Sequence, residues 1–375
     1  MRHTLFASLG MITAATAHAS AKAACEQPAV CCEEAKPGPF AFTFSPDRDI
    51  ACSQNFYVYM EGLAFQAKQD GMEFAGRVDQ NSGGIDFLQG ELAAFDNDHH
   101  NWKYQPGMRF GLGSYLNYDA WNFNCSWTWV HVTNYETIHA PNFGVISGTN
   151  LLPQEIAPFW DLGLAGTNSA ISATSVWNAS YNVLDFQLGK PYHLSRAVKC
   201  LLHAGARLAW INQHLSQRYG LITNPTTATN PIQHGDNHFW GIGGRIGLDT
   251  DWLVGKGWSL FANVSGSMVN GNFLIKQRSE PTVNSLGSDI GNIDIQRHMH
   301  QNMPNLEMAF GLSWKQHFLN NKYQISLQGA YEFIEWFDQL NLRKFISPNA
   351  LYLNDTISRG NLTMNGFSLR LQLDM

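Results

Sequence analysis

From about Phe56 to the end of the chain, apolar and polar residues alternate with a period of two. This period is typical of β-strands that have one apolar and one polar face. The alternation is clearest in residues 121–129, 240–252, 258–265 and 306–315. The pattern therefore predicts an all-β fold of many antiparallel strands.

The connections between these strands fall into two classes. Residues 253–257 and 319–322 are short and contain Gly or Asn, as in tight hairpin turns. Residues 134–158, 220–238 and 277–302 are long and polar, and we expect them to form loops. Short turns at one end and long loops at the other are typical of outer-membrane barrels.

The expected strands have about ten residues or more, which suits a tilted membrane crossing better than a soluble sandwich, whose strands are usually about five or six residues long. Several Trp residues stand at strand ends, as in interfacial aromatic girdles: Trp121, Trp240, Trp252, Trp258 and Trp314. We expect a single antiparallel transmembrane β-barrel. At about 20–22 residues per strand and connection it would have roughly 14–16 strands. A soluble secreted β-protein is the alternative, since its strands alternate too.

The last residues of the chain form the clearest strand. Phe367, Leu369, Leu371 and Leu373 alternate with polar residues up to Met375. An apolar edge strand left unpaired invites aggregation. We therefore expect this strand to pair with the first one and close the barrel.

The N-terminus has the features of a secretory signal: basic residues, an apolar stretch and small residues before residue 24. We expect a signal peptide over residues 1–23, a Cys- and Pro-rich disordered arm over 24–54, and the barrel over 55–375. A buried N-terminal helix and a lipoprotein signal at Cys25 are the weaker alternatives. The protein would be exported to the outer membrane.

Composition agrees with this location. Charged residues make up 14% of the chain and aromatic residues 13%, whereas soluble domains usually have about 25% charged residues. The net charge is −6. An acidic chain lacks the basic patches that nucleic-acid binding needs, so no such partner is expected.

Four of the six cysteines lie before residue 55, and we expect them to form disulfides in an oxidising compartment, within or between chains: Cys25, Cys31, Cys32 and Cys52. A zinc site is the alternative, but no pair of CxxC motifs is present. Cys125 and Cys200 are expected on the apolar faces of their strands.

Several segments together resemble the Legionella-type major outer membrane proteins, a pore-forming family with members in environmental chlamydiae. They are residues 56–65 (FYVYMEGLAF), 107–113 (GMRFGLG), 119–121 (DAW), 126–129 (SWTW), 184–189 (LDFQLG), 205–211 (GARLAWI) and 241–247 (GIGGRIG). The resemblance extends from Phe56 to Met375. It implies a porin-like pore, weakly gated or insensitive to voltage, often oligomeric and sometimes disulfide-linked. The terminal Met375 departs from the aromatic residue usual in outer-membrane barrels.

Catalytic chemistry has little support in the sequence. No HExxH or GxSxG motif occurs. The His pairs at 99–100 and 298/300 lie in expected loops, so no metal, cofactor or catalytic residue is expected.

The functional candidates are charged residues on the polar faces. Their parity predicts that they line the pore: Arg109, Asp185, Arg207, Arg245, Asp249, Glu307, Lys315, Glu332, Arg370 and Asp374. We expect an outer-membrane porin for passive diffusion of small hydrophilic solutes and ions. Its expected partners are membrane lipid, these solutes, and either further copies of the chain or disulfide-linked envelope proteins. A surface adhesin or structural barrel with a plugged lumen is the alternative.

Overall fold

The computed structural model describes residues 55–79, 92–93, 103–116, 121–139, 154–158, 170–221, 232–280, 282–283, 289–290, 294–319, 322–346, 354–357 and 359–375. The chain divides into two compact units, Met1–Lys36 and Pro37–Met375, and the described residues all belong to the second. The expected signal peptide and arm lie outside the described residues and stay predictions.

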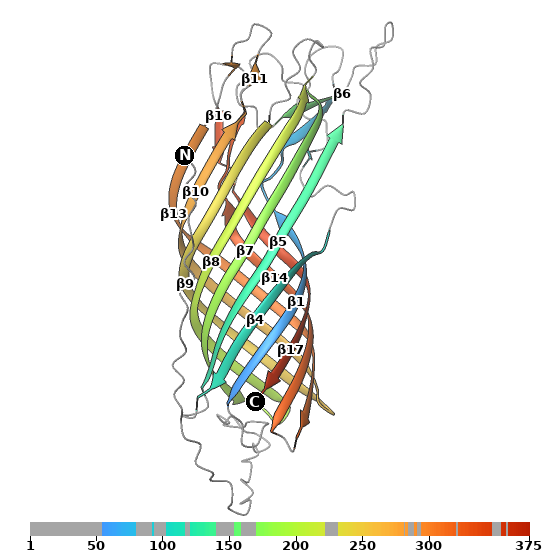
Figure 1. Ribbon diagram of the computed structural model, residues 1–375, viewed down its shortest axis with the longest axis vertical. Coiled ribbons are helices and arrows are strands. Elements are labelled where there is room, and N and C mark those ends of the chain that lie inside the picture. Colours follow the sequence, from blue (N-terminus) through green and yellow to red (C-terminus); the bar gives the residue numbers. More distant parts are fainter. Residues whose placement is uncertain are drawn as a thin grey trace, which may run out of the picture. The chain divides into compact units, whose positions relative to one another are not determined.

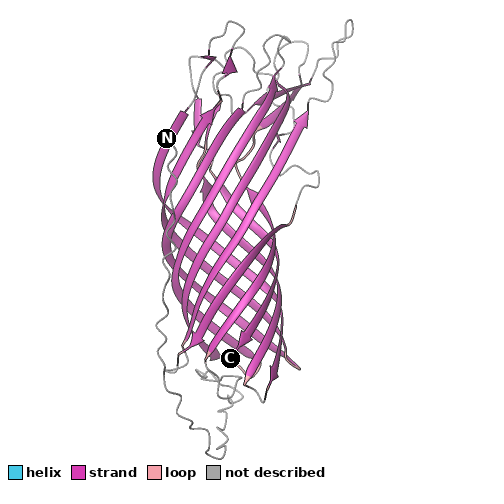
Figure 2. Ribbon diagram, viewed as in Figure 1, coloured by secondary structure: helices cyan, strands magenta, loops and turns pink. Residues whose placement is uncertain are grey.

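Every regular element of the described residues is a β-strand (Figures 1 and 2). Among these residues, no helix is long and apolar enough to cross a membrane. Ten long strands pair in a closed ring, each antiparallel to both neighbours. In ring order they are β1 (Phe56–Gln69), β4 (Gln105–Tyr115), β5 (Asn122–His139), β7 (Ala170–His193), β8 (Val198–Leu221), β9 (Ile232–Gly255), β10 (Trp258–Ser279), β13 (Asp294–Phe318), β14 (Tyr323–Leu340) and β17 (Gly360–Asp374).

The single antiparallel β-barrel predicted from the sequence is therefore confirmed, but the expected 14–16 strands are not. Most strands are much longer than the ten or so residues that a membrane crossing needs; β7, β8 and β9 each have 24. The same length of chain therefore forms fewer strands. Seven short strands lie in the connections: β2 (Ala75–Asp79), β3 (Leu92–Ala93), β6 (Gln154–Pro158), β11 (Thr282–Val283), β12 (Asp289–Ile290), β15 (Arg343–Ile346) and β16 (Asn354–Ile357).

First and last strands close the ring, as expected. β1 pairs with β17 from Tyr57↔Asp374 to Gln69↔Leu362. Beyond this ladder, Met375 N donates to the Phe56 carbonyl oxygen at 2.9 Å, and Phe56 N donates to that of Met375 at 3.4 Å. The ladder leaves neither strand as a free sheet edge at this seam.

Short connections join strands at one end of the barrel, called here the turn end. The expected hairpin between β9 and β10 is present, and its three residues have positive φ: Gly255 (127°), Lys256 (53°) and Gly257 (80°). Glycine adopts such angles without steric cost. Connections at the opposite end, the loop end, are longer, as residues 70–104 between β1 and β4 show.

The three expected loops are shorter than the sequence indicated. Strand β5 continues to His139, β9 begins at Ile232 and β13 begins at Asp294. These strand ends are polar, so they lack the apolar outer face that marks a membrane crossing. The backbone hydrogen bonds between neighbouring strands continue through these ends although the alternation of apolar and polar residues is absent there.

The two faces of β10 show where the polarity of the barrel changes. Towards the turn end, the outward residues are apolar and exposed, such as Val264 (49%), whereas the inward residues apart from Phe261 are polar: Ser259, Asn263, Ser265 and Ser267. Towards the loop end, the inward residues up to Ile275 are buried and mainly apolar, such as Val269 and Phe273, whereas the outward residues apart from Leu274 are polar: Asn270, Asn272, Lys276 and Arg278. An apolar outer face suits lipid and a polar one suits water, so the strand leaves the hydrocarbon near Met268.

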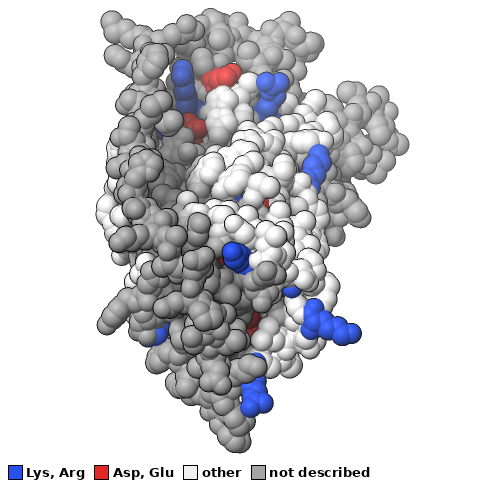
Figure 3. All heavy atoms as spheres, turned by 60° about the horizontal axis from the view of Figure 1, so that its bottom comes forward, with Lys and Arg blue, Asp and Glu red and all other residues white. Residues whose placement is uncertain are grey.

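Tryptophans mark both edges of the apolar outer band. Trp210 and Trp240 are direct neighbours towards the loop end, and Trp258 pairs with Trp314 at the turn end. Along β9, Trp240 and Trp252 are both more than half exposed. Twelve residues separate them, which corresponds to about 30 Å along the barrel axis for a strand tilted by roughly 40°. This matches the apolar band of about 25 Å with its two aromatic girdles. Most of the described surface in Figure 3 is neither acidic nor basic.

The interior is narrow because both strand number and stagger are modest. From Leu63, the register leads to Phe239 in one direction round the ring and to Asp251 in the other. The shear is therefore twelve residues. Eight-stranded barrels are just wide enough for side chains to fill, whereas 16–18 strands leave an aqueous channel. A ten-stranded barrel is much closer to the first case.

Candidate functional site: the barrel interior

All ten charged residues expected on the polar faces do face the interior. Eight of them line a cavity of about 110 Å³, and Lys315 and Asp374 line a second cavity of about 170 Å³ nearer the turn end. The eight are Arg109, Asp185, Arg207, Arg245, Asp249, Glu307, Glu332 and Arg370, and two of them, Asp249 and Arg370, line both cavities. That they line an open pore stays a prediction. Many of them form ion pairs with one another inside the barrel.

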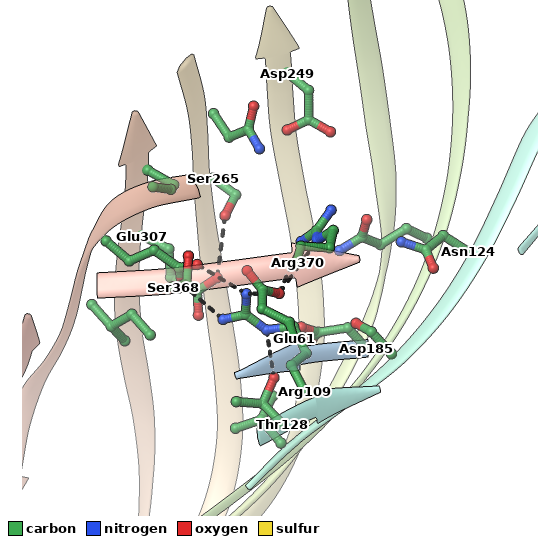
Figure 4. A pocket seen from close by; sticks show the side chains of 18 of the residues that line it. Glu61, Arg109, Asn124, Thr128, Asp185, Asp249, Ser265, Glu307, Ser368 and Arg370 are labelled. Atoms are coloured by element: carbon green, nitrogen blue, oxygen red, sulfur yellow. Dashed lines mark hydrogen bonds and ion pairs between the residues drawn. The ribbon is translucent and has the colours of Figure 1, made fainter. Parts of the chain in front are cut away.

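Arg109 of β4 is the centre of a first group of ion pairs. Its Nη1 lies 2.8 Å from Glu61 Oε2, and its Nη2 lies 2.9 Å from Glu332 Oε2. Arg370 of β17 also reaches Glu61 Oε2, at 3.1 Å, and its guanidinium lies over the ring of Tyr59 at 4.4 Å. Two arginines and two glutamates from four strands are thereby joined. Figure 4 shows Glu61, Arg109 and Arg370 of this group close together.

Arg207 of β8 is the centre of a second group. Its Nε and Nη2 both lie 2.7 Å from the carboxylate oxygens of Asp185, a bidentate pairing, and its Nη1 lies 2.6 Å from Glu307 Oε1. Arg245 Nη1 also reaches Asp185 Oδ2 (3.0 Å) and Glu307 Oε2 (2.7 Å). Bidentate geometry makes such pairs strong and directional.

These two groups line the same cavity and are called here the ionic network; their four arginines and four carboxylates balance in charge: Arg109, Arg207, Arg245, Arg370, Glu61, Asp185, Glu307 and Glu332. Several are fully buried; Arg207 is 1% exposed and Glu61 3%. Buried charges need good pairing geometry to offset their lost hydration. In this network the charged groups that would attract ions in an open pore are paired with one another instead.

Glu61 was missed among the candidates from sequence. It belongs to residues 56–65, where it was taken only as part of the family-like segment. The signal was present, because Tyr57, Tyr59 and Glu61 share one parity on β1 and face inward together.

An apolar layer fills the interior between the network and the loop end. Trp336 of β14 and Tyr181 of β7 meet there, with ring centroids 6.3 Å apart and Trp336 Nε1 donating to Tyr181 Oη at 3.3 Å. Because β14 and β7 are five strands apart in a ring of ten, this contact spans the full width of the barrel. Trp336 also packs on Phe239 of β9. The side chains of this layer are between 0% and 2% exposed: Phe65, Val132, Trp177, Tyr181, Ile211, Phe239, Val269, Phe273, Met303, Ile334 and Trp336.

Two connecting segments pack on this layer from the loop end. In residues 70–76, the buried Phe74 accepts a hydrogen bond through its carbonyl oxygen from Tyr219 Oη at 2.8 Å. In residues 338–343, Leu340 and Leu342 are buried. Gln277 bonds the backbone of Arg343 twice, donating to its carbonyl oxygen at 2.8 Å and accepting from its N–H at 2.9 Å.

The remaining sequence candidates divide between described and undescribed residues. Cys25, Cys31, Cys32 and Cys52 lie outside the described residues, so the expected disulfides stay a prediction. Cys125 and Cys200 are free and lie on outward-facing positions. Within the described part of the chain, no group of three or more His, Cys, Asp or Glu side chains could hold a metal ion.

The His pair at 298/300 was expected in a loop, but both residues lie on β13 with exposed side chains. The other expected pair, at 99–100, lies outside the described residues. His300 is bonded to Asn270 and Asn272 of the neighbouring strand. Both histidines belong to the polar outer wall beyond the tryptophan girdle.

Comparison with solved structures finds other outer-membrane proteins at low similarity. The outer membrane protease OmpT of Escherichia coli is 11% identical, with 90% of this chain and 99% of that chain covered and a TM-score of 0.41. A Pseudomonas aeruginosa FadL homologue is 8% identical, with 86% and 90% covered and a TM-score of 0.23. At these TM-scores neither similarity carries an argument about this chain. No curated protein matches it significantly.

The family comparison is decisive by its extent. A family described as the Legionella pneumophila major outer membrane protein precursor matches residues 51–375, which include every strand of the barrel. It agrees with the resemblance found in the sequence and with the apolar outer band between two girdles. The chain belongs to this family of outer membrane proteins.

Proposed function

We propose that this protein is a structural barrel of the outer membrane, with a lumen closed by its own side chains. The observation that carries the proposal is the contact of Trp336 with Tyr181 across the full width of the barrel. The ionic network lies on one side of this contact and the two inserted connecting segments on the other. A solute would have to displace all three layers.

In this proposal the short turns face the periplasm and the long connections face outward, as is usual for outer-membrane barrels. The polar outer wall beyond the tryptophan girdle then stands in the exterior and supports the connections. The barrel holds these connections at the cell surface, and it has no catalytic role.

A pore for small hydrophilic solutes and ions is the second candidate. Two polar cavities, of about 170 and 110 Å³, favour it, because they share lining residues such as Asp249, Asn263 and Arg370 and extend from the turn end to the network. The charged side chains at their junction would have to exchange partners before ions could pass. The apolar layer would also have to move.

Planar-bilayer recording of the refolded protein separates the two candidates. We expect wild type to give no conductance steps, because the Trp336 layer excludes water. Regular steps from wild type at low voltage would overturn the proposal in favour of the pore.

The same recording can test the residue that blocks the lumen. Trp336→Gly should give the barrel a measurable leak, since it removes the side chain that reaches the opposite wall. The matched control is Trp127→Gly, which removes an outward-facing indole that is 41% exposed and should leave the membrane silent. Equal behaviour of the two variants would contradict a block at Trp336.

A further inference from the structure

The outer wall just beyond the tryptophan girdle has an unusual charge arrangement. Trp210 of β8 pairs with Trp240 of β9, which pairs with Asn272 of β10. Beyond this row, the outward side chains of β8–β10 and β13 are mainly Asn, Gln, Ser, His and charged residues. This part of the wall lies at and above the level of lipid headgroups.

Three exposed cations project from this wall: Arg218 of β8, and Lys276 and Arg278 of β10. In the described residues none of them has an ion pair or a hydrogen bond through its side chain. Lys276 and Arg278 are two positions apart on one face of β10, so their Cα atoms are about 7 Å apart. Arg278 pairs in register with His234, and Arg218 with Ile232 of the same strand β9.

The acidic residues of the same wall are mostly occupied by histidines. His214 Nδ1 lies 2.6 Å from Asp236 Oδ1, and His234 Nε2 lies 3.3 Å from Glu280 Oε1. The two histidine rings stack at 5.7 Å. Asp236 is the register partner of Lys276, yet its carboxylate binds the histidine instead. Asp294 faces Arg278 in register without forming an ion pair. The cations are thereby left available to an external anion.

Hydrogen-bonding groups lie between these cations and the tryptophan girdle. Asn272 and His300 bond each other beside the girdle, and His298 lies one register step further along β13. Amide and imidazole groups bind sugar hydroxyls and phosphate oxygens, and Lys and Arg bind phosphate through charge-assisted hydrogen bonds.

We propose that this wall binds the phosphorylated sugar headgroup of a glycolipid in the outer leaflet, with Lys276 and Arg278 as its main phosphate ligands. Lys276 lies four residues beyond Asn272, about 10 Å along the barrel axis. Long basic side chains can reach from this position towards the membrane surface. A sugar headgroup extends further from the hydrocarbon than a simple phospholipid headgroup, so it fits the height of this site. The proposal does not depend on whether the lumen conducts.

The test compares two double variants of the full-length barrel in detergent. Lys276→Gln with Arg278→Gln removes the proposed phosphate ligands. Lys256→Gln with Lys322→Gln removes two exposed cations at the turn end and is the matched control. Binding of diphosphorylated lipid A is measured by titration, and the midpoint of thermal unfolding is recorded with and without the lipid.

We expect wild type and control to bind lipid A equally and to unfold several degrees higher in its presence. The Lys276/Arg278 variant should bind roughly 25-fold more weakly, because each cation near anionic headgroups contributes about 1 kcal/mol. All three proteins should unfold at the same temperature without lipid, which shows that the variants are folded. If a variant unfolds at a lower temperature than wild type without lipid, its lipid binding is judged from the titration alone.

Two further arms identify the ligand. Dephosphorylated lipid A should not stabilise wild type, and neither should inorganic phosphate, which lacks the sugar and acyl parts. Equal binding by wild type and the Lys276/Arg278 variant would overturn the proposal. Stabilisation of wild type by inorganic phosphate alone would also overturn it, since the site would then be a simple anion site.

Discussion

Arginine at the centre of the barrel has a role that depends on its partners. Arg109 separates Glu61 from Glu332, and without it these two buried carboxylates would be close neighbours with one remaining cation, Arg370. Removing one partner of a buried ion pair is far more costly than replacing the whole pair by apolar groups. The stability that the network contributes therefore depends on all of its charges being present together.

We expect Arg109→Met to lower the free energy of unfolding by about 3–5 kcal/mol, because it leaves an uncompensated buried charge. Adding Glu332→Gln should recover part of this loss, since Glu61 and Arg370 then remain as a balanced pair. Urea unfolding followed by tryptophan fluorescence measures both changes. Arg196→Met, at an exposed turn position, is the control and should be close to wild type. No difference between Arg109→Met and this control would mean that water solvates the network.

Along a single strand, the polarity of the outward face changes from one end to the other. The outward residues of β10 are apolar from Leu260 to Met268 and polar from Asn270 onward except Leu274, while the parity of the strand never changes. The inward residues of the same strand are mainly polar within the membrane and mainly apolar just beyond it, from Val269 to Ile275. The membrane thus determines which face of the strand is hydrophobic.

A pair of lysine substitutions on β10 tests the position of this boundary. Val264→Lys places a charge in hydrocarbon and should cost about 2–4 kcal/mol near the midplane. Asn272→Lys lies on the same face beyond the boundary and should cost about 1 kcal/mol or less, the value of one exposed hydrogen bond. The folded fraction after refolding into vesicles measures both. If the two substitutions are equally costly, the boundary lies beyond Asn272.

The whole molecule is stabilised by closure of the ring. Every long strand has two hydrogen-bonded neighbours, including β1 and β17 at the seam. In lipid, unsatisfied backbone groups cost several kcal/mol each, so a closed barrel resists detergent where an open sheet does not.

The unboiled protein should therefore migrate as a compact form on a gel, and boiling should shift it to the position of the unfolded chain. Deleting residues 367–375 should abolish the compact form, because it removes the closing half of β17. Met375→Ala retains the backbone bonds to Phe56 and should keep it. A heat-dependent shift that survives the deletion would show that closure at this seam is not needed.

Width is the property of the whole molecule that changes the functional conclusion. A barrel of 14–16 strands would leave room for water around the inward charges, as the expected general pore requires. With ten strands, side chains from opposite walls meet, as Trp336 and Tyr181 do. The same inward residues then form a packed core.

The amino-acid sequence was enough to predict the strand pattern, the membrane location and the inward face of the ten candidate charged residues. These follow from the period-two alternation, which is a local property: Leu369 is exposed and Arg370 faces inward, as their parity indicates. The same alternation in residues 56–65 also predicts that Glu61 faces inward. Local patterns are weaker at strand ends beyond the membrane, where the expected loops were too long.

The number of strands, the width of the interior and the partners of each charge could be read only from the folded barrel. These depend on the registers of all ten pairings at once, and no local pattern encodes such a sum. Arg207 meets Glu307, one hundred residues away, because the shear of twelve brings β8 and β13 to the same height inside the barrel. The inward residues are a property of single strands, but whether they line a channel or fill it depends on the closed ring.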